Sequence, residues 1–201
     1  MLILLTCEAV YIMEDNFTQD NVRSRLLFSG LKELETHGVS DFSLRRVAQD
    51  AGVSCAAPYR HFKDKDELIA EVIRFVVEGW TLLSQQICRI FSDNERELII
   101  ELSVAGLRFW IANGNFRTVI MAFTSLTSMQ GNALRDFDAP IASAIKRYAA
   151  SQGISDVEPL VFKVLSMIYG AVILVDGGYE SADNAALNLR SVLNAEFGKA
   201  Q

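Results

Sequence analysis

Apolar residues recur at steps of three and four along nearly the whole chain, and almost nowhere do apolar and polar residues alternate one by one. This spacing collects the apolar side chains on one face of an α-helix, whereas a half-buried strand needs a two-residue period. Only three prolines interrupt the pattern over 201 residues. The sequence therefore predicts an all-α fold.

Turn residues divide this pattern into helices of very different lengths. Breaks are expected at sequences such as NGN, MQGN, SQGIS and DGGYES, where glycine and asparagine favour turns. Ser43 and Ser54 are expected to cap two short helices at their N-termini. The expected helices run from Phe17 or Asp20 to Thr36, and over Ser43–Ala51, Ser54–Phe62, Lys65–Phe91, Glu95–Asn113, Asn115–Ser128, Asn132–Ser151, Asp156–Asp176 and Ala182–Phe197.

The sudden increase in helix length at Lys65 predicts a domain boundary. We expect a loose N-terminal extension over residues 1–13, a small helical domain over 14–63 and a larger helical domain over 64–201. The apolar start MLILLTCEAVYIM has no basic residue ahead of it and contains Glu8, unlike a secretory signal. The next apolar run, residues 164–175, is shorter than the ~20 residues that cross a bilayer, so no membrane segment is expected.

Cysteine usage and charge favour a cytoplasmic protein whose first domain is close to neutral. Cys7, Cys55 and Cys88 are an odd number at wide spacings, so a disulfide framework is not expected. The net charge is −6, but residues 14–65 hold as many basic as acidic side chains. The first domain is therefore the less acidic part of the chain and the better candidate for contact with nucleic acid.

The segment GVSCAAPYRHFKDKDEL, residues 52–68, predicts a helix-turn-helix. Two short helices are joined by the tight turn GVS, and a supporting helix precedes them. In this arrangement the second short helix enters the major groove of DNA. The small residues CAA at its expected start would let the backbone come close to base edges.

The longer segment FSLRRVAQDAGVSCAAPYRHFKDKDELI resembles the N-terminal signature of TetR-family transcriptional regulators. The shared features are SLRRVA in the second helix, the turn AGVS, the aromatic block YRHF and the K-x-x-L that opens the next helix. The resemblance covers residues 17–69, and beyond them only the length and the helical layout agree. It implies a sequence-specific DNA-binding regulator, most often a repressor. It also implies a homodimer on a palindromic operator and release by a small, largely apolar effector bound in the C-terminal helices.

The helix-turn-helix geometry and the resemblance together assign one set of residues to DNA. Hydroxyl, imidazole and cationic side chains are expected on phosphates, and Arg60 can make two hydrogen bonds to guanine. Cys55 stands where the family often has a basic or polar residue, so it is a weaker candidate for reading bases. The expected DNA-contacting residues are Ser43, Arg45, Arg46, Ser54, Cys55, Ala56, Ala57, Tyr59, Arg60, His61, Lys63 and Lys65.

Other chemistries fit the same residues less well. Cys55 and His61 could be a nucleophile and a base, but six residues apart on one helix they face different directions. Two histidines and three scattered cysteines lack metal-ligand spacing, so we expect no enzyme activity, metal or cofactor. A redox-active Cys55 stays open, because a helix N-terminus lowers a thiol pKa. The alternative function is a small-molecule or redox sensor with lost or weak DNA binding.

The larger domain offers candidates for a ligand cavity and for a dimer interface. Large aromatic side chains provide enough apolar surface to line a cavity. The last two helices carry apolar stripes, and Ser166 and Gly170 permit close helix approach, which favours a four-helix bundle with a second copy. The effector candidates are Trp80, Phe109, Trp110, Phe116, Phe123 and Tyr169. The interface candidates are Val161, Leu165, Ile168, Val172, Leu189 and Leu193.

Overall fold

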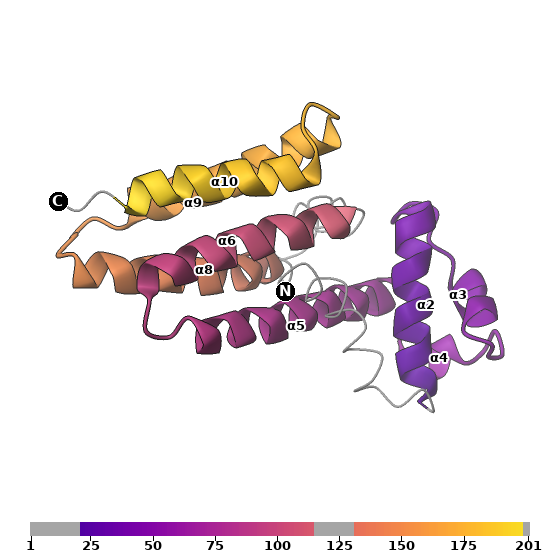
Figure 1. The fold of residues 1–201 in the computed structure, drawn as a ribbon. Helices are drawn as coiled ribbons and strands as arrows, with labels where there is room; N and C mark the ends of the chain where they lie inside the picture. The colour runs from indigo at the N-terminus through magenta and orange to yellow at the C-terminus, as the bar shows by residue number, and fades with distance from the viewer. Residues whose placement is uncertain (1–20, 115–130, 199–201) are drawn as a thin grey trace. The chain divides into compact units, whose positions relative to one another are not determined.

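The chain is all-helical over the part that the structure describes. The structure is a computed structural model, which describes residues 21–114 and 131–198, and these ranges contain helices and no strand (Figure 1). The prediction of an all-α fold is confirmed. Contacts divide the chain into two compact units: Met1–Trp80 with Gly114–Leu134, and Thr81–Asn113 with Arg135–Gln201.

In the described residues of the first unit, three helices are followed by the start of a fourth. Helix α2 (Val22–His37) packs against α3 (Leu44–Asp50) and α4 (Pro58–His61), and α5 (Lys65–Ile90) follows. The side chain of Asn21 caps α2 by accepting from the amide of Arg23 at 2.9 Å. The shared core is apolar, with Leu26, Leu34, Val47, Ala48, Phe62 and Leu68 all buried.

Helix α5 begins at Lys65, as the sequence predicts, and its start is fixed by two carboxylates. The side chain of Asp64 accepts from the amide of Glu67 at 2.9 Å, and the Glu67 carboxylate accepts from the amide of Lys63. This reciprocal capping satisfies amides that the helix itself leaves unpaired. The division between the two units falls within α5, after Trp80. The boundary at residue 63 or 64 stays a prediction.

The second unit contains the end of α5, the helix α6 (Glu95–Ala112), all but the first residues of α8 (Gly131–Ser151), and the helices α9 (Glu158–Asp176) and α10 (Ala182–Phe197). Helix α6 packs against both α9 and α10, which also pack against each other (Figure 1). Its residues are buried on almost every side, as expected of a central helix with a low apolar asymmetry. Arg190 on α10 pairs with Glu101 on α6 at 2.6 Å, which ties these two helices by charge as well as by packing.

The helix bounds agree closely with the prediction except in the third helix. We expected that helix to start behind Ser54, but α4 starts at Pro58. Proline has no amide hydrogen and a fixed φ, so it is favoured at the first position of a helix. The residues before it form a turn, in which the amide of Ala57 donates to the carbonyl of Ser54 at 2.8 Å. The expected helix at Asn115–Ser128 lies outside the described residues.

Helix α9 is the most apolar element that the structure describes. Over Glu158–Asp176 its mean hydropathy is 1.8, and by length and composition it could cross a membrane. A core helix of a soluble protein passes the same test. Only 17% of its most apolar window is buried, however, so α9 keeps a large apolar surface that the described part of the chain does not cover.

Candidate nucleic-acid interface

The first short helix, α3, is held at its N-terminus by two side chains. The hydroxyl of Ser43 accepts from the amide of Arg46 at 3.4 Å, and the carboxylate of Glu33 accepts from the amide of Ser43 at 3.0 Å. The cap at Ser43 agrees with the prediction. Arg45 lies on the exposed face of the helix, while Val47 and Ala48 face the core. The N-terminal end of α3 therefore exposes the cationic side chain of Arg45 next to a helix terminus that Ser43 and Glu33 hold in place.

The turn after α3 depends on a left-handed glycine. Gly52 has φ +64°, and its amide donates to the carbonyl of Gln49 at 3.2 Å. The next amide, from Val53, donates to the carbonyl of Ala48 at 3.0 Å, so the last carbonyls of α3 are satisfied. A side chain at position 52 would meet nothing closer than the guanidinium of Arg25 at 3.9 Å. The requirement for glycine is therefore conformational.

The residues expected to start the recognition helix lie in the turn instead. Ser54, Cys55 and Ala56 are exposed, whereas Ala57 is buried and caps α4 without a side-chain hydrogen bond. Ala57 therefore packs into the first unit, and the expectation that its side chain faces DNA is wrong. The physical reason is Pro58, which places the helix start three residues later than Cys55.

Polar and cationic side chains dominate the exposed surface of α4 and the residues after it. The Tyr59 ring is 63% exposed, and Arg60, His61 and Lys63 are exposed as well. Lys65 differs, because its ammonium lies 5.9 Å from the centroid of the Phe42 ring and its side chain is half-buried. The structure thus leaves three cationic or titratable groups and a phenol open to solvent.

Arg46 turns toward α2 and not toward the exposed face of α3. Its guanidinium bonds the carboxylate of Glu33, with Nε at 2.8 Å and Nη2 at 2.6 Å from the same oxygen, and also contacts Asp41. These partners raise the pKa of Arg46 above its ordinary value, chiefly through the hydrogen bond to Glu33. The side chain of Arg46 is therefore engaged within the first unit, unlike the exposed side chain of Arg45.

The C-terminal end of α4 is anchored by an aromatic and ionic contact. Phe62 is buried, and the guanidinium of Arg23 lies 5.4 Å from the centroid of its ring. Arg23 also pairs with Glu71 on α5, which pairs in turn with Arg74. This chain of contacts links α2, the end of α4 and the first turns of α5. These contacts hold the end of the second short helix in place within the protein itself.

No group of three or more His, Cys, Asp or Glu side chains within the described ranges could hold a metal ion. Cys55 is a free, exposed cysteine and Cys88 is free and half-buried. The geometry of the described head is thus that of a binding surface: two short helices joined by a glycine turn, exposed cations, and a buried apolar support.

The family model of "Bacterial regulatory proteins, tetR family" matches residues 26–72, which contain α3, the glycine turn, α4 and the start of α5. Over these residues the chain matches the TetR family of regulators. The match and the shared fold fit an N-terminal helix-turn-helix domain followed by a helical C-terminal domain, and they support DNA-binding transcriptional regulation. A search of curated proteins finds no match.

Solved structures share this TetR fold over most of their length. A protein of unknown function from Rhodococcus sp. RHA1 superposes with a TM-score of 0.74 at 21% identity, covering 92% of this chain and 99% of that one. A TetR transcription regulator from Haloarcula marismortui gives 0.69 at 16%, covering 88% and 95%. The TetR-family regulator PfmR from Thermus thermophilus gives 0.64 at 20%, covering 88% and 99%. Identities this low establish the fold alone.

The aromatic residues expected around an effector are mostly core. Trp110 is fully buried, with its ring centroid 4.3 Å from that of Phe137, and Trp80 and Phe109 are also buried. Tyr169 is half-buried, and its hydroxyl donates to Asp138 at 2.8 Å. Phe116 and Phe123 lie outside the described residues. An effector role for this set stays a prediction.

The interface candidates of the last two helices face inward. Five of the six side chains are buried within one chain, and only Leu165 is half-exposed. The stripe that the sequence shows is therefore the one that packs on α6, and it cannot provide a surface to a second copy. The buried five are Val161, Ile168, Val172, Leu189 and Leu193.

Several residues that matter to the geometry were not identified from the sequence. Glu33 holds the N-terminus of α3, and Asp138 pairs with Tyr169. The sequence did contain a signal for Glu33: it lies next to Leu34 on the inward face of α2, where a carboxylate needs a partner. For α9, a signal was available in Phe162 and Ile173, apolar residues on the side opposite the buried stripe.

Proposed function

We propose that this TetR-family regulator is a homodimeric repressor that binds a palindromic operator and is released by a small-molecule effector. The observation that supports it most is the exposure of Tyr59, Arg60 and His61 on a short helix, and of Lys63 just after it. The buried Phe62 anchors the end of this helix. Such groups suit phosphates and base edges in a major groove. A regulator that binds chromosomal DNA is also placed in the cytoplasm.

Within this proposal the exposed residues have distinct roles. Arg60 reads a guanine edge with two hydrogen bonds, while Arg45, Tyr59, His61 and Lys63 contact phosphates. Ser43 adds its hydroxyl at the start of α3. Ser54, Cys55 and Ala56 in the exposed turn allow close approach of the backbone, and Lys65 contributes a more distant positive charge. Arg46 is left out of this set, because its guanidinium is engaged by Glu33 and Asp41.

The dimer surface that we propose is the outward face of α9 and α10, on the side opposite the stripe that packs on α6. Five large apolar side chains there are at least half exposed, and α9 and α10 lie side by side (Figure 1). An apolar patch of this kind on a soluble protein marks an interaction surface. A second copy would bury both helices in a four-helix bundle. The surface is made of Phe162, Ile173, Leu174, Leu187 and Val192.

The regulatory mechanism follows from the spacing of two heads on one operator. Each head of a dimer must enter a major groove, and half-sites lie ~34–36 Å apart or a multiple of this distance. An effector that binds better to a conformation with a different head separation shifts the population away from the DNA-binding state. Helix α5, which begins in the first unit and continues into the second, is the element through which we expect this change to pass.

A salt titration of DNA binding tests this function. A duplex selected by the protein from a random-sequence pool should bind far more tightly than an unselected duplex. Its log-log salt dependence should be steep, because each phosphate contact contributes a slope of ~0.9. Addition of the effector, found by thermal-shift screening of apolar compounds, should release the selected duplex. Absence of salt-sensitive binding to every duplex would contradict DNA binding.

A sensor with weak DNA binding is the second candidate. It is favoured by the balance of acidic and basic residues in the first domain and by the ion pairs that engage Lys32 and Arg46. These pairs leave fewer free cations for phosphates. The same titration distinguishes the two: a sensor would bind its small molecule but select no sequence from the pool.

A further inference from the structure

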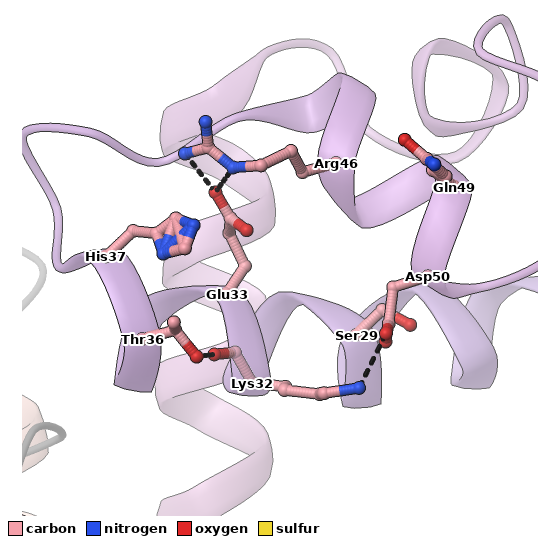
Figure 2. Close-up of a pocket in the computed structure, with 8 residues that line it drawn as sticks. All are labelled: Ser29, Lys32, Glu33, Thr36, His37, Arg46, Gln49 and Asp50. Carbon is pink, nitrogen blue, oxygen red and sulfur yellow. Dashed lines mark hydrogen bonds and ion pairs between the residues drawn. The ribbon is translucent and has the colours of Figure 1, made fainter.

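A polar groove lies between α2 and α3, on the DNA-binding domain itself. It has a volume of about 570 Å³, and charged and polar side chains line it (Figure 2). Two ion pairs cross it. Lys32 pairs with Asp50 at 2.6 Å toward the C-terminal end of α3, and Glu33 pairs with Arg46 nearer the N-terminal end. The seven residues of α3 are thus tied to α2 at both ends.

The two ion pairs differ strongly in exposure. Lys32 and Asp50 are 68% and 41% exposed, which is typical of a surface pair that contributes about 0–1 kcal/mol. The Glu33 side chain is only 8% exposed, although that of Arg46 is 40% exposed. A buried carboxylate is retained only where its charge is compensated and its oxygens are hydrogen-bonded. The buried charge of Glu33 is therefore stable only with its hydrogen-bond partners in place, and these partners are held in place by Glu33.

The partners of Glu33 all belong to the N-terminal part of α3. One oxygen accepts from the backbone amide of Ser43 at 3.0 Å and from Nε of Arg46 at 2.8 Å. Arg46 is also held by the side chain of Asp41 at 3.2 Å and by the carbonyl of Asp41. In Figure 2 the guanidinium of Arg46 lies directly against the Glu33 carboxylate. One buried carboxylate thus fixes the first helical turn and the loop before it.

We propose that Glu33 and Arg46 are positioning residues for DNA recognition: neither touches DNA, and together they set the placement of α3, which carries Arg45 behind its cap Ser43 and leads through the glycine turn to α4. This rests on the proposed function, in which Ser43 and Arg45 contact phosphates. A seven-residue helix has little rigidity of its own, because nucleating a helix is unfavourable and short helices depend on tertiary contacts. The carboxylate and the guanidinium fork supply that rigidity through directional, charge-assisted hydrogen bonds.

The alternative role for Arg46 is direct contact with a phosphate, and salt dependence separates the two roles. A lost phosphate contact lowers the log-log salt slope by ~0.9 for each protomer. A lost positioning contact leaves the cation of Arg45 in place, and a long exposed side chain can still reach a phosphate, so the number of neutralised phosphates should stay nearly unchanged. It weakens binding to the selected sequence, because base contacts need accurate placement, and it leaves binding to an unselected duplex nearly as before.

The test compares three variants on the selected duplex and on an unselected duplex of equal length. Glu33→Gln keeps the shape and removes the charge, Arg46→Lys keeps the charge and removes the fork, and Arg46→Gln removes both. All three should lose about tenfold in affinity for the selected duplex, the scale of one misplaced base contact. Their salt slopes should change by much less than the ~0.9 per protomer of a lost phosphate contact, and their affinities for the unselected duplex should stay within about twofold of that of the unsubstituted protein.

Lys32→Gln is the matched control, because it breaks the other ion pair of the same groove. It should change affinity for the selected duplex less than about twofold. A second readout needs no DNA: in Glu33→Gln, amide hydrogen exchange should accelerate at Ser43 and Arg46 while the α2 core stays protected. If Glu33→Gln does not fold, the affinity and salt slope of Arg46→Lys are compared with those of the unsubstituted protein instead.

Three results would overturn the positioning role. In the first, Arg46→Gln alone lowers the salt slope and Arg46→Lys binds normally, which makes Arg46 a phosphate contact. In the second, the variants lose thermal stability but their folded fraction keeps its preference for the selected duplex, which makes the pair a stabilising contact only. In the third, no duplex binds even to the unsubstituted protein, and both the positioning role and DNA binding then fail.

Discussion

The hydroxyl of Tyr169 on α9 donates a 2.8 Å hydrogen bond to the carboxylate of Asp138 on α8. The Tyr169 ring lies 6.0 Å, centroid to centroid, from that of the buried Trp110 on α6. Burial raises the pKa of Asp138 to about 6, and the hydrogen bond from Tyr169 acts in the opposite direction. The pKa of Tyr169 is raised too, first by burial and then by the charge of Asp138. The second unit therefore contains a carboxyl group that titrates near pH 6.

Asp138 should make the free energy of unfolding depend on pH. Its folded pKa of about 6 lies above the ordinary 3.8, so the folded protein binds the proton more tightly than the unfolded chain does. The contribution is most favourable below pH 4 and is lost as the pH rises through 6, by about 3 kcal/mol in total. Asp138→Asn should therefore be more stable than the unsubstituted protein at pH 7.5 and nearly equal at pH 4. Chemical denaturation at both pH values measures the difference.

Tyr169→Phe provides the control for this titration. The substitution removes the hydrogen bond that opposes burial, so the pKa of Asp138 should rise further and the pH midpoint of the stability difference should move upward. The other groups that titrate between pH 4 and 7 are common to all three proteins and cancel in the comparison. A stability difference between Asp138→Asn and the unsubstituted protein that does not vary with pH would contradict the assignment.

Gly52→Ala should destabilise the DNA-binding domain by about 1–2 kcal/mol, because an L-residue is strained in the left-handed region. No packing cost is expected, since an added Cβ meets nothing closer than 3.9 Å. Gly52→Asn should be milder, because asparagine tolerates this conformation better than alanine does. The midpoints of urea unfolding measure both effects. Equal destabilisation by the two variants would show that the turn fails for a reason other than its φ angle.

The sequence was sufficient for features that depend on local interactions. Apolar periodicity predicted most helices. Ser43 predicted the N-terminal cap of α3, and Gly52 predicted the turn after it. Each of these features is determined by interactions among a few neighbouring residues. The start of α4 was misjudged because two N-terminal signals compete there. Ser54 is a favourable cap, but Pro58 four residues later needs the first helical position, and the structure follows Pro58.

Features that depend on contacts between distant residues could not be predicted in the same way. Glu33 and Arg46 are brought together only when α3 packs on α2. The sequence can place Glu33 on the inward face of α2, but it does not show that Arg46 is the partner. On α9 both sides are apolar, so periodicity shows a stripe without showing which side faces α6. Ile168 is buried and Phe162 is 74% exposed, yet the sequence gives them equal weight.

Phe162→Asp should convert the proposed dimer into a monomer. The side chain is 74% exposed, so the chain itself loses little packing, whereas an interface that buries it would have to bury an unpaired carboxylate. We expect the dimer dissociation constant to rise about tenfold to a hundredfold, the effect of losing a large side chain from the centre of an interface. Analytical ultracentrifugation over a concentration series measures it.

Two matched variants separate the interface from the core. Leu187→Glu, at a 64% exposed position on α10, should dissociate the dimer in the same way. Leu193→Asp, at a fully buried position on the same helix, should unfold the second unit at any protein concentration. If Phe162→Asp and Leu187→Glu remain dimeric, the outward face of α9 and α10 is not the dimer surface. Binding of the unsubstituted protein to lipid vesicles would then point to a membrane partner for α9.

Arg60→Ala and Lys63→Ala should weaken DNA binding in different ways. Arg60 is assigned to a base, so its loss should reduce discrimination by about 1–3 kcal/mol at one position of each half-site and relax the sequence preference. Lys63 is assigned to a phosphate, so its loss should weaken selected and unselected duplexes alike and lower the salt slope by ~0.9 per protomer. Lys63 is a cleaner test than Lys65, whose ammonium also lies near the Phe42 ring.

Anisotropy titrations at several salt concentrations, on single-base variants of the duplex, measure the affinity, the sequence preference and the salt slope of each variant. The same loss of preference in both variants would refute this division of roles, and a lowered salt slope in Arg60→Ala would assign that residue to a phosphate.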